Sequence, residues 1–383
     1  MQGEWDEDVE RRDLDDEMSQ GRRVRLPFFT WRRLGSVAMI LAIAAAFVDE
    51  GDARPRETDD RTLAGHLGLI ETLRFSPDGK TLLTAGWDRT VRIWDVEAAP
   101  TAGFGAELAC LTVDAEIYAA SLSSDGGIVA VAGLDGVTLW NWREDSIPPR
   151  TLDDAGPCRA LAFSPDDRTL AVGGFDHQIR IVDVESGRVN SVLAGHEDVV
   201  RKFAFTPDCR GLISLSYDGR LKCWDLPEGR ESTRFHDLND VSRPILTFAL
   251  APAGDVLALS RFNERLRRIE IWDANRGLRS GYTESVDRAV HALEFSKDGG
   301  VLASSDSDHR IRFWNSVTGR AAGALEGRQG WVRTLDFSAD GRWIALSSVP
   351  DQVLLKPIGL PNLSANSTAA TIRHEPSGTP GDA

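Results

Sequence analysis

Two segments of this 383-residue chain carry a histidine, a hydroxyl side chain, an aspartate and a tryptophan at the same spacing. The two sets are His66, Thr84, Asp88 and Trp94, followed by His196, Ser214, Asp218 and Trp224. A hydroxyl, an imidazole and a carboxylate are also the groups with which many hydrolases attack their substrates. Because the spacing recurs with a structural repeat, we interpret both sets as part of the scaffold and expect no enzymatic activity.

Other residue patterns offer little for metal or cofactor chemistry. The other histidines of the repeats are scattered without the spacing of metal ligands: His177, His236, His291 and His309. The cysteines form no Cys-x-x-Cys pair. We therefore predict neither a bound metal nor another cofactor.

The charge of the chain argues against a further class of partner. The formal net charge is −15 at pH 7, whereas a surface that binds nucleic acid must be cationic to neutralise phosphates. We expect no nucleic-acid partner.

The polar sets lie within a sequence unit that recurs seven times at intervals of about forty to fifty residues. In its clearest copy, an apolar strand ends in the turn Ser76-Pro77-Asp78-Gly79, a second apolar strand follows, and a third closes on Trp94-Asp95. Proline presets one backbone dihedral of such a turn, aspartate bonds to its own backbone, and glycine accepts a positive φ. A repeat of this length predicts a repetitive architecture.

Gly65-His66 followed by Trp94-Asp95, and Gly195-His196 followed by Trp224-Asp225, resemble the repeats of the WD-repeat family. The resemblance covers residues 61–358 and implies an all-β, seven-bladed β-propeller of four-stranded antiparallel blades. It also implies that each polar set links a loop, two strands and a turn, and so satisfies buried polar groups. The first residues of the repeat region would then join the last blade and close the ring.

The residues outside the repeats differ in composition. Residues 1–33 form a charged leader that ends in a basic cluster, and we predict that it is disordered. Residues 34–48 contain no charge and are predicted to form a short hydrophobic helix, and residues 49–60 follow as a charged tether. Residues 359–383, rich in small and polar residues, are predicted to be a flexible tail.

The apolar segment 34–48 has a length between that of a signal-peptide core and that of a membrane span. We predict that it crosses a membrane once and leaves the propeller on the non-cytoplasmic side, because arginines precede it and acidic residues follow it. One alternative is a cleaved signal peptide and a secreted or periplasmic protein, and another is a cytoplasmic protein. Translation could begin at Met1 or at Met18.

The turns between second and third strands should share one rim of the propeller, the face that members of the family commonly use to bind proteins or peptides. These turns and one early residue of the last copy present the candidates Trp87, Arg89, Phe175, His177, Tyr217, Arg220, His309 and Trp331. A longer connection in the fifth copy adds Arg261, Phe262, Arg265, Arg267 and Arg268. Arginine and aromatic residues are enriched where partners bind most tightly, although arginines paired with neighbouring carboxylates would explain this connection too.

The sequence as a whole predicts a non-catalytic scaffold that binds an unidentified protein or peptide and is held at or beyond a membrane. One alternative is an exported propeller that is an enzyme or binds a cofactor, with carboxylates and histidines converging in its central channel. The other is a cytoplasmic assembly subunit, in which residues 34–48 would form a docking helix.

Overall fold

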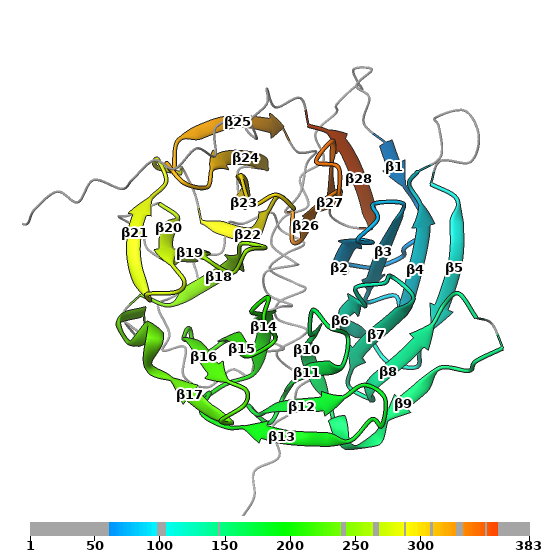
Figure 1. Cartoon of the computed structure of the whole chain (residues 1–383). Coiled ribbons are helices and arrows are strands. Elements are labelled where there is room, and N and C mark those ends of the chain that lie inside the picture. Colours follow the sequence, from blue (N-terminus) through cyan, green and yellow to red (C-terminus); the bar gives the residue numbers. More distant parts are fainter. Residues whose placement is uncertain are drawn as a thin grey trace, which may run out of the picture. The chain divides into compact units, whose positions relative to one another are not determined.

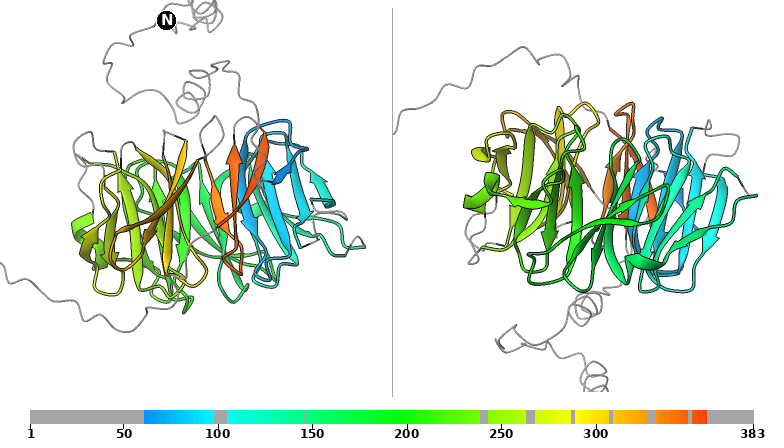
Figure 2. Two further views of the ribbon diagram at one scale, coloured as in Figure 1. Left: turned by 90° about the horizontal axis from the view of Figure 1, so that it is seen from above. Right: turned by 60° about the horizontal axis from the view of Figure 1, so that its bottom comes forward.

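The structure is a computed structural model that describes residues 61–97, 105–144, 146–238, 243–262, 268–286, 289–306, 309–326, 332–348 and 351–358. These residues form seven four-stranded antiparallel sheets, which are arranged as the blades of a β-propeller around a central axis (Figure 1). Two further views show the strands of the blades running between the two faces of the propeller (Figure 2). The predicted all-β architecture with seven four-stranded blades is confirmed.

Each blade runs outward from its first strand at the central axis to its last strand at the rim. Blade one comprises β2 (Ile70–Phe75), β3 (Thr81–Gly86), β4 (Thr90–Asp95) and β5 (Glu107–Thr112). Blade two comprises β6 (Ile117–Leu122), β7 (Ile128–Gly133), β8 (Gly136–Asn141) and β9 (Arg150–Leu152). Blade three comprises β10 (Cys158–Phe163), β11 (Thr169–Gly174), β12 (Ile179–Asp183) and β13 (Val189–Leu193). Blade four comprises β14 (Val200–Phe205), β15 (Gly211–Ser216), β16 (Leu221–Asp225) and β17 (Arg230–Ser232). Blade five comprises β18 (Ile245–Leu250), β19 (Val256–Arg261), β20 (Glu270–Asp273) and β21 (Leu278–Tyr282). Blade six comprises β22 (Val290–Phe295), β23 (Val301–Asp306), β24 (Arg310–Asn315) and β25 (Ala321–Glu326). Blade seven comprises β26 (Leu335–Phe337), β27 (Trp343–Ser348), β28 (Gln352–Pro357) and β1 (Arg61–Leu63). Two short 3-10 helices, η1 (Asp153–Ala155) and η2 (Thr233–Leu238), follow β9 and β17.

Blade seven is completed by the first described residues of the chain. Strand β1 pairs antiparallel with β28, so that Arg61 lies opposite Leu355 and Leu63 lies opposite Val353. This closure, which the family resemblance implies, covers the edge of β28 that would otherwise be free to pair with another chain.

In blades one to four, six and seven, the turn after the first strand is held by its own side chains, because a serine or threonine hydroxyl donates to the aspartate two residues further on. In blade one, Ser76 Oγ donates to Asp78 Oδ1 at 2.6 Å, and Gly79 adopts the left-handed region with φ 71°. Blades three and four carry Asp167 and Cys209 at the equivalent position, both with φ 58°. The turn geometry therefore persists where glycine is absent, at a modest conformational cost.

The described hydrophobic core is divided into seven layers, each between two neighbouring blades. Between blades seven and one, for example, Ala345 and Leu355 pack with Leu73 and Trp94. Loss of one blade would expose two such layers to water, so each blade depends on both of its neighbours.

The predicted location in a membrane needs a correction. We expected a single-pass protein with its propeller on the non-cytoplasmic side, but no helix among the described residues is long and apolar enough to cross a membrane. The segment 34–48, for which the short hydrophobic helix was predicted, lies outside the described residues, as do the leader, the tether and the tail.

Candidate functional site

The polar set of blade one connects the loop before β2 with strands β3 and β4. Trp94 Nε1 donates to Thr84 Oγ1 at 2.7 Å, and Thr84 Oγ1 lies 2.7 Å from His66 Nε2. His66 Nδ1 lies 2.9 Å from Asp88 Oδ2, which also accepts the backbone N–H of Leu67 at 3.0 Å. Because an ionised carboxylate can only accept, His66 Nδ1 carries the proton and Thr84 donates its own proton to Nε2. We call this chain of hydrogen bonds the blade-one relay.

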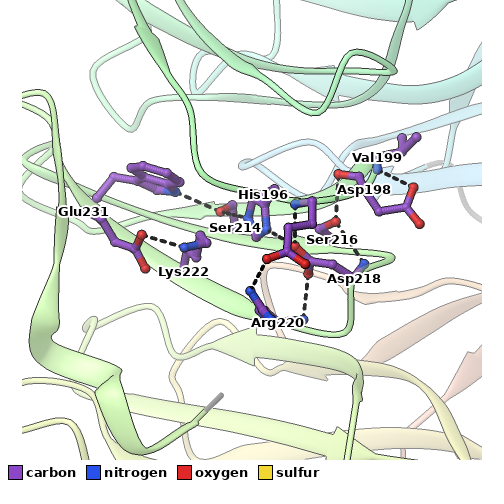
Figure 3. Close-up of polar contacts among 11 residues, drawn as sticks. His196, Asp198, Val199, Ser214, Ser216, Asp218, Arg220, Lys222 and Glu231 are labelled. Atoms are coloured by element: carbon purple, nitrogen blue, oxygen red, sulfur yellow. Dashed lines mark hydrogen bonds and ion pairs between the residues drawn. The ribbon is translucent and has the colours of Figure 1, made fainter. Parts of the chain in front are cut away.

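Blade four contains the same arrangement, which we call the blade-four relay. Trp224 Nε1 donates to Ser214 Oγ at 2.8 Å, and Ser214 Oγ lies 2.7 Å from His196 Nε2. His196 Nδ1 lies 2.9 Å from Asp218 Oδ2, so the imidazole is held between a hydroxyl and a carboxylate (Figure 3).

Both relays serve the fold and leave no nucleophile for catalysis. Thr84 and Ser214 are fully buried, and each hydroxyl already accepts one hydrogen bond and donates another. A hydrolase needs a nucleophile that its substrate can reach. Burial lowers the pKa of His66, although the neighbouring carboxylate of Asp88 opposes this shift, so its imidazole is neutral in the folded chain.

Blade six retains only part of a relay. Trp314 Nε1 donates to Ser304 Oγ at 2.9 Å. The buried Val286 stands where blades one and four have their histidine. An apolar side chain at this position removes one polar group that would need a partner.

Arg261, which the sequence analysis included among the candidates for partner binding, belongs to the buried structure of blade five. Its Nε lies 3.1 Å from Glu270 Oε1, and its Nη1 and Nη2 donate to the carbonyls of Arg243 and Leu238 at 2.8 and 2.9 Å. Glu270 Oε2 also accepts Trp272 Nε1 at 3.0 Å. With 6% of its side chain exposed, Arg261 supports the fold, and we leave it out of the candidate surface.

Five large side chains stand immediately after the second strands of blades one to five, at the end of the propeller where the first strands begin. We call this end the upper end and these residues the outer arc: Trp87, Leu134, Phe175, Tyr217 and Phe262. The backbone N–H groups of Trp87, Tyr217 and Phe262 donate to carbonyls just before the first strands, at 2.9, 3.0 and 2.9 Å. Leu134 and Phe262 are exposed, by 50% and 58%. Leu134 was not among the residues expected from the sequence, because its turn carries neither an arginine nor an aromatic residue.

The other candidates are placed as follows. Arg89, His177 and His309 adopt positive φ values of 65°, 68° and 66° in the turns that follow second strands. Arg220 is half-buried and forms an ion pair, and Arg268 is exposed. Three candidates lie outside the described residues: Arg265, Arg267 and Trp331.

A second group at the upper end surrounds the central axis and was not recognised in the sequence. The first strands, which are innermost in Figure 1, shift their pairing register near their beginning in blades one to six. Such a β-bulge redirects one side chain. We define the axial ring as the six bulged residues and their counterpart in blade seven: Glu71, Tyr118, Arg159, Arg201, Leu246, His291 and Arg333. In the sequence, each of these residues stands five positions before the first residue of the turn that follows its strand.

Contacts among blades one, three and seven show that side chains of the axial ring meet near the axis. Arg159 Nη2 of blade three lies 3.4 Å from Glu71 Oε2 of blade one, and Arg333 Nη2 of blade seven lies 2.8 Å from Glu71 Oε1. Trp87 Nε1 also donates to Glu71 Oε1, at 3.0 Å, and so links the outer arc to the axial ring. The ring thus contains three arginines and one glutamate, of which Arg159 and Arg333 pair with Glu71, within a chain whose overall charge is strongly negative.

Deeper along the axis, the charges are more nearly balanced. Arg74 Nη1 lies 3.1 Å from Glu294 Oε2, and Lys297 Nζ lies 2.8 Å from Asp336 Oδ1. Burial lowers the pKa of Lys202 to about 8. Among these axial side chains, the excess of positive charge is therefore greater in the axial ring, where three arginines accompany one glutamate.

Two further observations limit the chemistry of the propeller. Within the described ranges, no group of three or more histidine, cysteine, aspartate or glutamate side chains is arranged to hold a metal ion. A pocket of about 410 Å³ at the opposite end of the axis is lined mostly by alanine, phenylalanine and proline residues. Its lining offers packing surface and a single ionisable side chain, Asp167.

Comparisons with known proteins agree with this fold. The family model described as "WD domain, G-beta repeat" matches residues 58–95, 147–183, 187–225 and 279–315. The chain is 30% identical over 135 residues to transcription initiation factor TFIID subunit 5 of Caenorhabditis elegans, and 30% identical over 132 residues to the guanine nucleotide-binding protein subunit beta of Nicotiana plumbaginifolia. It is 29% identical over 139 residues to the small ribosomal subunit protein RACK1z of Arabidopsis thaliana. These alignments cover 35%, 33% and 31% of this chain, and 20%, 35% and 41% of the three proteins, so the chain spans less than half of each relative.

Proposed function

Because the chain belongs to the WD-repeat β-propellers, we propose that it is a non-catalytic scaffold that binds a protein or peptide partner at its upper end. Three of the similar proteins carry names that describe a subunit or a component of a larger assembly. These names describe those proteins, and the shared fold extends an interaction role to this chain as our proposal.

The observation that carries this proposal is the outer arc. Five consecutive blades each place a large aromatic or aliphatic side chain at the same position, and Leu134 and Phe262 are half or more exposed. Exposed apolar side chains that lie together on a polar surface are typical of sites where partners bind. Backbone hydrogen bonds to the starts of the first strands hold Trp87, Tyr217 and Phe262 in place, so little order has to be created on binding.

Site-specific photo-crosslinking tests the proposal. A photoreactive phenylalanine analogue in place of Phe262 should form a crosslink to a discrete partner in extracts of the native cell. The same analogue at Val317, in the turn between β24 and β25, is a matched control because Val317 is 72% exposed and stands apart from the outer arc.

Replacing Phe175 by alanine in the Phe262 crosslinking variant should reduce the yield, because it removes another contact of the outer arc, two blades away. Equal crosslinking from Phe262 and Val317, or none from Phe262, would contradict the proposed role of the upper end.

A further inference from the structure

We propose that the axial ring binds an oxyanion, a carboxylate or phosphate group carried by an acidic segment of the partner protein. The inference rests on the scaffold role proposed above, and it specifies the chemistry by which the upper end recognises its partner. Its starting point is that Arg159 and Arg201, on neighbouring blades, each keep an Nε–H group that no described residue accepts.

Unpaired donors of this kind need an explanation, because buried polar groups in folded proteins are nearly always hydrogen-bonded. Arg159 is only 8% exposed, and it donates Nη1 to the carbonyl of Tyr118 at 2.8 Å while Nη2 faces Glu71. Arg201 donates Nη2 to the carbonyl of Leu246. The terminal nitrogens thus fix the two side chains, and the buried Nε–H groups are left without an acceptor among the described residues.

Both guanidinium groups are held by aromatic rings before any ligand arrives. Arg159 lies over the ring of Tyr118, with 5.2 Å between the guanidinium carbon and the ring centroid, and Arg201 lies over Tyr217 at 5.1 Å. Stacking of this type leaves the edge of a guanidinium free for hydrogen bonds. Since the donors are already oriented, a ligand would lose little of its binding free energy in ordering them.

The charge of the axial ring favours an anion. Glu71 is shared by Arg159 and Arg333, and Tyr118 Oη contacts the carboxylate of Glu116 at 3.3 Å. No described carboxylate forms an ion pair with Arg201. Burial, together with the nearby charge of Arg159, lowers the pKa of Arg201 even though Tyr217 and Asp218 oppose the shift. An incoming oxyanion would offset this local excess of positive charge.

The surroundings of the axial ring favour a peptide segment as the carrier of the anion. Tyr217 belongs to the outer arc and also holds Arg201, and Trp87 of the outer arc donates to Glu71. A segment with apolar residues beside an acidic or phosphorylated residue could contact the outer arc and the axial ring together. A free small anion would use only the axial ring.

Fluorescence anisotropy of labelled peptides with the full-length chain tests the inference. The probes are a peptide of six glutamates, the same peptide with one phosphoserine, and a neutral peptide of six glutamines, with inorganic phosphate as a competitor. The glutamate or the phosphoserine peptide should bind, and the glutamine peptide should not. Because the chain carries a net charge of −15, unspecific attraction of anionic peptides is not expected.

Three variants locate the binding. Arg159→Gln and Arg201→Gln should each weaken the affinity by about tenfold or more, as expected for the loss of one charge-assisted hydrogen bond. Glu71→Gln should strengthen it, because it frees Arg159 and Arg333 from their internal carboxylate. A variant that merely damaged the fold would not bind more tightly.

Arg342→Gln is the matched control and should leave the affinity unchanged, since this exposed arginine pairs with Asp340 of its own turn and with no other described carboxylate. Absence of binding by both anionic peptides, or equal binding by Arg201→Gln and the unaltered chain, would overturn the inference. Inorganic phosphate that binds as tightly as either peptide would reject a partner segment as the carrier. If the Phe262 crosslink forms while no anionic peptide binds, the result supports the scaffold role and rejects the oxyanion site.

Discussion

The relays of blades one and four and the axial ring are both clusters of polar side chains inside the propeller, but they differ in how completely they are satisfied. In the blade-four relay, Trp224, Ser214, His196 and Asp218 pass hydrogen bonds from one to the next. In the axial ring, Arg159 and Arg333 share Glu71, and Arg159 and Arg201 each have an Nε–H group without an acceptor among the described residues.

The difference separates groups that support the fold from groups that are available to a ligand. Residue types alone would suggest the opposite, because the relays contain the serine, histidine and aspartate of a hydrolase. Satisfied hydrogen bonds and full burial assign the relays to the fold, whereas the unsatisfied donors of Arg159 and Arg201 support the recognition role that we propose for the axial ring.

The largest expected effect is on the stability of a relay. Ser214→Ala leaves both Trp224 Nε1 and His196 Nε2 without their partner, whereas Ser304→Ala in blade six affects only Trp314 Nε1. We expect Ser214→Ala to lower the free energy of unfolding by about 2–4 kcal/mol and Ser304→Ala by about 1–2 kcal/mol.

Equilibrium unfolding in denaturant measures both values. The two serines are matched because both are at most 1% exposed. Equal losses in the two variants would mean that the histidine adds nothing to the relay.

The next effect concerns pH. Burial lowers the pKa of His66 and of His291, and the charges of Arg333 and Arg201 add to the shift at His291. Below their ordinary pKa of about 6.5, the unfolded chain therefore binds protons that the folded chain does not. Stability is greatest above this pH and is lost as the pH falls through it towards the lower folded values, by at most about 1.4 kcal/mol per pH unit for each histidine.

Unfolding free energies of the unaltered chain and of His291→Gln, measured between pH 8 and pH 5, test this expectation. The difference between the two proteins cancels the background from the many surface carboxylates. The variant should lose less stability as the pH falls, and parallel curves would show that His291 binds its proton equally in both states.

The smallest expected effect has the opposite sign. Arg201→Met keeps the length of the side chain but removes a charge that has no described carboxylate partner, so the free energy of unfolding should stay constant or rise by about 1 kcal/mol. Thermal unfolding of this variant, with anisotropy of the glutamate peptide as the second readout, completes the comparison. A strongly destabilised Arg201→Met would place the axial ring with the relays, as a support of the fold.

Most of the architecture was predictable from the sequence because turns and strand ends carry local signals. The turn Ser76-Pro77-Asp78-Gly79 and the closing pair Trp94-Asp95 mark a blade without reference to the rest of the chain. The family resemblance also implied the pairing of β1 with β28, which no local signal contains.

The candidate site was less predictable because it depends on distant contacts and backbone irregularities. The burial of Arg261 follows from its pairing with Glu270 and two carbonyls, and no pattern in its own turn reveals this. The alternation of polar and apolar residues does not reveal the β-bulges that direct Arg159 and Arg201 to the axis. Only their constant distance from the following turn could have pointed to them.

The pairing of Arg61 with Leu355 also determines when the ring can close during synthesis of the chain. The residues are 294 positions apart (355 minus 61), and a ribosome adds about 5–20 residues per second. Strand β1 therefore waits on the order of tens of seconds for its partner, while the growing arc of blades exposes an open sheet edge to other chains. The chain is therefore most prone to misassembly during its synthesis, before β1 can pair with β28 and close the ring.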